Sequence, residues 1–240
     1  TFRLLQTFDL EPNYNVTLLS LWDKRTLLCC SRWQGLLLLD LNTGKCRRPP
    51  FDCGKEIMNV LIDSQKRIWV APYNGGLNCL TRDGKLLATY TTHNSSLSNN
   101  VILSLAEREG EIWIGTDGGG INILDPETGH FSLLEHVPGS DNYSLPANSI
   151  LCLYNDYNNN IWAGSIRNGL ISIREVSMKT YTDVPPGNDR GLSNNTVLSL
   201  FQESQDQIWV GTDGGGINNF NPLTEKFTHY PSTWEDKVAS

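Results

Sequence analysis

Short segments in which apolar and polar residues alternate recur along the chain, and turns rich in Gly, Pro, Asn and Asp separate them. The segment Val197–Phe201 is one example. No stretch sustains the 3.6-residue apolar spacing of an amphipathic helix. The pattern therefore predicts β-strands joined by hairpins along the whole chain.

One apolar strand with a central tryptophan occurs four times, and its tryptophans are separated by 44, 49 and 47 residues: Trp69, Trp113, Trp162 and Trp209. A fifth, degenerate copy carries Leu28 in place of tryptophan. Each unit of about 45 residues reads as four antiparallel strands, which is typical of a β-propeller blade. The predicted fold is therefore all-β, a β-propeller of about five four-stranded antiparallel blades whose tryptophans pack between blades. The expected blades are residues 14–55, 56–98, 99–146, 147–193 and 194–232.

Residues 1–8 resemble the fourth strands of later units, such as the strand expected at Phe227–Tyr230. Because five complete units leave no place for this additional strand, we expect it to be the outer strand of a preceding or closing blade. The chain is then part of a larger propeller.

The connections between units share a second motif: Leu97–Asn100, Leu145–Asn148 and Leu192–Asn195. Each precedes a first strand at the same offset. We expect the asparagines to hydrogen-bond to backbone groups of a turn.

The composition excludes several classes of partner. With 19 basic and 26 acidic residues the net charge is −7, which disfavours nucleic acid. Apolar runs such as Leu36–Leu39 are far shorter than the roughly 20 residues of a membrane-spanning helix. The six cysteines form no Cys-x-x-Cys pair and do not cluster with the four histidines, so we expect no metal and no cofactor. A disulfide between Cys46 and Cys53 stays open, because an oxidising compartment favours it whereas burial of Cys46 opposes it.

The fifth unit carries the pattern Asn195–Val197, Ile208–Gly216, Asn221–Pro222 and Glu225–Phe227, which resembles the two-component regulator propeller repeat. That repeat occurs in the periplasmic sensor regions of bacterial hybrid two-component histidine kinases. The resemblance implies a periplasmic sensor domain of an inner-membrane-anchored protein, which binds a glycan or oligosaccharide and signals to a linked histidine kinase. A homodimer through the full sensor region is compatible with it.

The turns between second and third strands are the candidate site. Two of them are identical, at Thr116–Gly119 and Thr212–Gly215, whereas the other three diverge. Sugars are bound by aromatic faces together with planar polar groups. The first candidates are therefore Arg32, Trp33, Tyr73, Asn74 and Arg167, and the second are Asp117 and Asp213. The two arginines also suit a carboxylated or sulfated sugar.

Two alternatives to a binding module stay open. A polysaccharide lyase or hydrolase could use Asp117 and Asp213 as acid and base, although their equivalent places in near-identical turns favour a turn-capping role. A scaffold or dimerisation module would bind no small ligand. We therefore predict no catalytic residue in this chain.

The segment Asp156–Asn160 opens like a calcium loop but lacks the glycine at the sixth position, which favours a polar hairpin.

Overall fold

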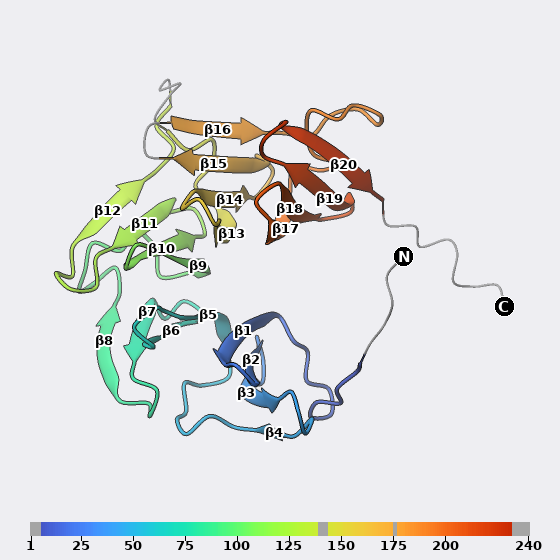
Figure 1. Ribbon diagram of the computed structural model, residues 1–240. Helices are drawn as coiled ribbons and strands as arrows, with labels where there is room; N and C mark the ends of the chain where they lie inside the picture. The colour runs from blue at the N-terminus through green and yellow to red at the C-terminus, as the bar shows by residue number, and fades with distance from the viewer. Residues whose placement is uncertain (1–5, 139–143, 175–176, 232–240) are drawn as a thin grey trace. The chain divides into compact units, whose positions relative to one another are not determined.

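The computed structural model describes residues 6–138, 144–174 and 177–231, and every regular element within them is a β-strand (Figure 1). Twenty strands form five four-stranded sheets, and the strands of each sheet pair in chain order as an antiparallel meander. The predicted all-β propeller fold with four-stranded blades is confirmed. Within this part of the chain there is no helix of the length and apolar character that crossing a bilayer requires.

Blade 1 contains β1 (Leu18–Asp23), β2 (Thr26–Ser31), β3 (Gly35–Asp40) and β4 (Cys46–Arg47). Blade 2 contains β5 (Ile57–Ile62), β6 (Ile68–Pro72), β7 (Leu77–Leu80) and β8 (Leu86–Tyr90). Blade 3 contains β9 (Ile102–Arg108), β10 (Glu111–Thr116), β11 (Ile121–Leu124) and β12 (Phe131–Leu134). Blade 4 contains β13 (Ile150–Asn155), β14 (Ile161–Ser165), β15 (Leu170–Arg174) and β16 (Ser177–Tyr181). Blade 5 contains β17 (Val197–Ser204), β18 (Gln207–Thr212), β19 (Gly216–Asn221) and β20 (Lys226–Tyr230).

The blades belong to two compact units. The first unit comprises residues 1–95 and 100–102 and holds blades 1 and 2. The second comprises residues 96–99 and 103–240 and holds blades 3 to 5, apart from the first residue of β9.

The outer strand expected at residues 1–8 is not assigned. Residues 1–5 lie outside the described part of the chain, and residues 6–8 are not in a strand. Phe8 instead packs against the buried cluster around Tyr14 and Leu37. A larger propeller therefore stays a prediction.

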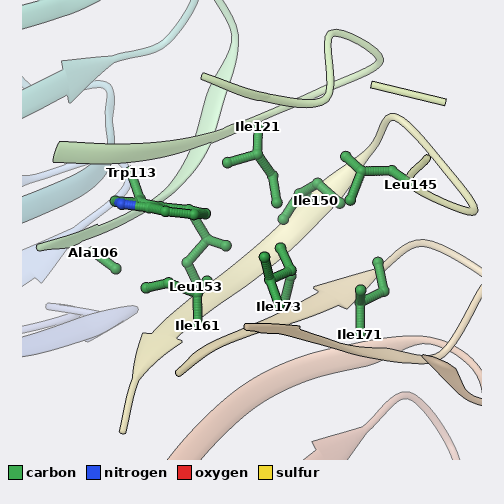
Figure 2. Close-up of a cluster of buried hydrophobic side chains, with 10 residues drawn as sticks. Ala106, Trp113, Ile121, Leu145, Ile150, Leu153, Ile161, Ile171 and Ile173 are labelled. Atoms are coloured by element: carbon green, nitrogen blue, oxygen red, sulfur yellow. The ribbon is translucent and has the colours of Figure 1, made fainter. Parts of the chain in front are cut away.

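In the second unit Trp113 and Trp162 pack between successive blades, as predicted, whereas Trp209 of the last blade lies against Tyr230 of its own blade. Trp113 of β10 lies in a buried cluster with Ile121 of its own blade and with Leu153 and Ile161 of blade 4 (Figure 2). Trp162 of β14 packs in the same way on blade 5, where its ring meets Phe220 edge-on at 5.4 Å between centroids. Such burial of large rings is a main source of stability in the fold.

A carboxylate six residues before three of the tryptophans binds the indole N–H. Asp63 accepts from Trp69 at 2.9 Å, and Asp156 accepts from Trp162 at 2.9 Å. The third pair, Glu203 and Trp209, is 2.7 Å apart. These indole–carboxylate ties span the hairpin between the first and second strands. They were not predicted, although the constant spacing is visible in the sequence.

The Asp156 segment is a polar hairpin rather than a metal loop. Its carboxylate also accepts the backbone N–H groups of Asn158 and Asn160, at 2.9 and 2.8 Å. Among the described residues there is no group of three or more metal-ligating side chains.

The cysteines are all free thiols, so Cys46 and Cys53 are not bonded to each other. Cys30 lies in the core between blades 1 and 2 with Leu36 and Ile57, where burial raises the pKa of its thiol to about 12. It packs as a small apolar residue. Cys46, by contrast, is only partly buried, which corrects the expectation of a core position.

Candidate functional site

Each blade joins its second and third strands by a turn of five residues: 31–35, 72–76, 116–120, 165–169 and 212–216. The fifth position is a glycine with positive φ in all five turns. A Cβ at Gly76 would lie 2.2 Å from the carbonyl oxygen of Tyr90, and one at Gly120 would lie 2.3 Å from that of Leu134. The glycine is therefore required because the backbone at the end of the fourth strand lies directly against it.

In the turns of blades 3 to 5, the side chain at the first position closes the turn with an internal hydrogen bond. The hydroxyls of Thr116, Ser165 and Thr212 donate to the carbonyl oxygens of their fifth-position glycines at 2.9, 3.0 and 2.9 Å. The third position is open, because a Cβ built at Gly118 or Gly214 meets no atom within 4 Å. All seven predicted site residues occupy the second or third position: Arg32, Tyr73, Asp117 and Asp213 the second, and Trp33, Asn74 and Arg167 the third.

In blade 3 the turn is tied to the preceding connection. Ser98 donates its backbone N–H to Oδ1 of buried Asn122 at 2.9 Å, and Nδ2 of Asn122 donates to the Ser98 hydroxyl at 2.7 Å. The Ser98 hydroxyl then donates to the carbonyl of Gly119, and Asn99 donates to that of Asp117. The expected hydrogen bond from a connection asparagine to the turn is thus present.

Blade 5 repeats this pairing and blade 4 replaces it. Ser193 and Asn218 form the same two hydrogen bonds, both 2.9 Å long. In blade 4 the connection residue is Pro146, and the residue at the Asn122 position is buried Ile171. Proline has no N–H to satisfy, so an apolar partner is adequate there. The closed turns are therefore scaffold, and the pairing is encoded in the sequence.

The turns of blades 1 and 2 bring three predicted residues together in the first unit. The Arg32 guanidinium carbon lies 5.2 Å from the Trp33 ring centroid and 5.8 Å from the Tyr73 ring centroid. Both rings are exposed, with 62% of Trp33 and 53% of Tyr73 accessible. Asn74 follows Tyr73 at the open third position and is also exposed. We call Arg32, Trp33 and Tyr73 the aromatic–arginine cluster.

Arg32 is held by the rings rather than by an acidic partner. Its Nε is buried and has no hydrogen-bond partner, and no carboxylate among the described residues forms an ion pair with it. A guanidinium over two aromatic faces gains cation–π energy while its remaining N–H groups stay available. The cluster can therefore stack on an apolar surface and donate hydrogen bonds to a ligand.

A cavity of about 570 Å³ begins next to this cluster. Its walls come from the start of β3 and from the connection between blades 1 and 2: Gln34, Gly35, Leu36, Arg48, Pro49, Pro50, Phe51, Asp52, Cys53, Gly54 and Lys55. Arg48 supports the wall by donating to the carbonyls of Gln34 and Leu36 at 2.6 and 3.2 Å. These cavity residues were not predicted, since an irregular connection leaves no periodic signal in the sequence.

The other three candidates lie in the second unit. The Asp117 carboxylate accepts the Ser149 hydroxyl at 2.9 Å, and the backbone N–H of Asp213 donates to the Thr196 carbonyl at 2.9 Å. Arg167 has a left-handed backbone with φ of 68°. Within the described part of the chain, no hydrogen bond or ion pair joins these three residues to one another.

Known proteins resemble both the sequence and the fold. Three segments, residues 96–118, 144–167 and 191–214, match the family model of the two component regulator propeller. Each match runs from a connection through the first two strands into the turn of blades 3, 4 and 5. No curated protein sequence matches the chain.

Two solved structures of low sequence identity share the fold. PorZ of Porphyromonas gingivalis is 14% identical with a TM-score of 0.63, and the match covers 91% of this chain and 34% of PorZ. The WD40 β propeller domain of Doa1 is also 14% identical with a TM-score of 0.63, over 91% of this chain and 71% of that domain. The extracellular domain of a proposed hybrid two component system, BT3049 of B. thetaiotaomicron, is 25% identical with a TM-score of 0.48. That match covers 92% of this chain, which spans only 28% of the BT3049 domain. On the three sequence matches, the chain contains two component regulator propeller repeats.

Proposed function

We propose that this chain is part of the periplasmic sensor region of a hybrid two-component regulator and binds an oligosaccharide without cleaving it. The bound state would be passed to a linked histidine kinase. The proposal places the ligand on the first unit, at the aromatic–arginine cluster.

The family match supports a role in two-component signalling, because the matched model describes the propeller of two component regulators. The observation that carries the ligand class is Arg32 lying within cation–π distance of two exposed rings, those of Trp33 and Tyr73. Exposed rings on two neighbouring blades can stack on the C–H face of a sugar, and the guanidinium N–H groups can bind its hydroxyls. Without a ligand, this much exposed aromatic surface would face water at some cost.

A thermal-shift screen of the chain against neutral and acidic oligosaccharides tests the proposal. A ligand that binds only the folded state raises the apparent Tm with concentration. We expect at least one oligosaccharide to raise it, and Trp33→Ala to weaken that ligand at least about 10-fold, as removal of a central aromatic contact does.

Tyr157→Ala is the matched control. Tyr157 is exposed to a similar extent, at 65%, but lies in the β13–β14 hairpin rather than in a turn between second and third strands. Its loss should leave binding unchanged. Equal losses in both variants would contradict the placement of the ligand. Appearance of cleaved sugar would favour a lyase or hydrolase, and the absence of any shift would favour a scaffold.

A further inference from the structure

We propose that the aromatic–arginine cluster and the adjoining cavity form one site for an acidic saccharide, in which Arg32 and Lys55 bind a carboxylate or sulfate group. This inference rests on the proposed function and deepens it.

The aromatic–arginine cluster and the cavity lie next to each other on both blades. On blade 1, Gln34 lines the cavity and follows Trp33 directly in the chain. On blade 2, the backbone N–H of Tyr73 donates to the carbonyl of Glu56 at 2.7 Å, and Lys55 next to Glu56 lines the cavity. The cluster and the cavity are therefore neighbours at either side, and a volume of about 570 Å³ is in the usual range for a small-molecule site.

The cations of this site lack internal partners. Neither Arg32 nor Lys55 forms an ion pair within the described residues. The cavity's other cation, Arg48, is paired with Glu11. The cavity has one carboxylate in its lining, that of Asp52, which accepts the backbone N–H of Gly54 at 2.9 Å. In a chain of net charge −7, unpaired cations beside a cavity favour an anionic ligand over a neutral one.

Other arginines that lie over tryptophan rings differ in one respect. Arg82 lies 4.2 Å from the Trp22 centroid and donates to the Trp22 carbonyl, so its hydrogen bonds are used internally. Arg108 lies 5.7 Å from the Trp113 centroid, and its Nε is unpartnered like that of Arg32, but Trp113 is only 4% exposed. Arg32 differs from both because the two rings that it contacts, those of Trp33 and Tyr73, are exposed and can be reached by a ligand.

Calorimetric titration with matched pairs of saccharides tests the inference. One pair is a short oligogalacturonate and its carboxyl-reduced neutral product, and the other is a sulfated galactose disaccharide and its desulfated form. We expect one acidic member to bind at least about 10-fold more tightly than its neutral partner, because charge-assisted hydrogen bonds are the strong ones. Its affinity should fall as NaCl rises from about 50 mM to about 500 mM. The pair that binds identifies the anionic group.

Variants locate the effect. Arg32→Gln and Lys55→Gln should each weaken the acidic ligand about 10-fold or more and leave the Tm of the free chain within a few degrees. Arg108→Gln is the matched control and should bind like the parent chain. Equal binding of acidic and neutral partners would overturn the acidic site but leave saccharide sensing intact. Failure of every saccharide, in this titration and in the thermal screen, would overturn both.

Discussion

The turns of blades 1 and 2 occupy the same place in each blade as the turns of blades 3 and 5. The two pairs differ in whether their polar groups are hydrogen-bonded inside the protein. In blade 3, the hydroxyl of Thr116 and the amide of Asn122 are used inside the protein. In blades 1 and 2, Arg32 forms no ion pair within the described residues, and the rings of Trp33 and Tyr73 beside it are exposed. A turn whose polar groups are bonded internally holds the blade together, whereas a turn that exposes aromatic rings beside an unpaired cation is available to a ligand.

The largest effect should follow from breaking a closed turn at its fifth position. In Gly120→Ala the new Cβ would lie 2.3 Å from the Leu134 carbonyl oxygen in a left-handed backbone, so we expect about 3 kcal/mol or more of lost stability. Gly118→Ala is the control, because its φ of +83° is similar but its Cβ would meet no atom. It should cost only about 1–2 kcal/mol in urea unfolding. Equal costs would show that the close approach is unimportant.

The next prediction tests whether the serine–asparagine pair of blade 3 can be replaced by the proline–isoleucine pair of blade 4. Asn122→Ile leaves the Ser98 N–H without its acceptor and should cost about 2–3 kcal/mol. Adding Ser98→Pro reproduces the Pro146 and Ile171 pair of blade 4 and should recover at least about half of that loss. A double-mutant cycle from urea unfolding measures the coupling. Strictly additive losses would refute the pairing rule.

A small change in stability is expected from a substitution in the exposed turn of blade 1. Trp33→Ala should alter the free energy of unfolding by less than about 0.5 kcal/mol, because an exposed turn side chain contributes little packing. Its effect should appear in ligand binding instead. A loss near that of Asn122→Ile would mean that the exposed ring is structural.

The last prediction concerns reactivity rather than stability, at Cys53, which lines the cavity. Burial raises the pKa of this thiol from 9.0 to about 11, so at about pH 8 its thiolate is roughly 100-fold rarer than in a free cysteine. Alkylation by iodoacetamide, followed by peptide mass spectrometry, should be slow and should accelerate as the pH rises toward 11. The ligand should slow it further at Cys53 and not at Cys46, which lies outside this cavity. Alkylation of Cys53 at the rate of a free cysteine would contradict its burial.

The sequence predicts the fold well because one pattern is repeated five times. The spacing of the tryptophans predicts the blades, and the place of Trp113 and Trp162 between blades follows from their recurrence. The seven candidate site residues could be located at the second and third turn positions by comparing the turns with one another.

The contacts within the site could not be predicted in the same way. Arg32 meets Tyr73 only because two blades bring their turns together, and no spacing along the chain encodes that distance. The cavity beside them is formed by an irregular connection, residues 48–55, for which the repeat provides no template. Two regularities were readable and were missed: the carboxylate six residues before tryptophan, and the exchange of Ser98 and Asn122 for Pro146 and Ile171.

The indole–carboxylate ties bear on how such a domain diversifies after duplication. In blade 2 the bond between Asp63 and Trp69 fixes the register of β6 from the end of the strand that lies away from the turn at residues 72–76. Drift in that turn therefore does not loosen the strand pairing. The residues of the turn, Tyr73 among them, can therefore change from one blade to another while the hydrogen bond that sets the strand register stays at the opposite end of the same hairpin.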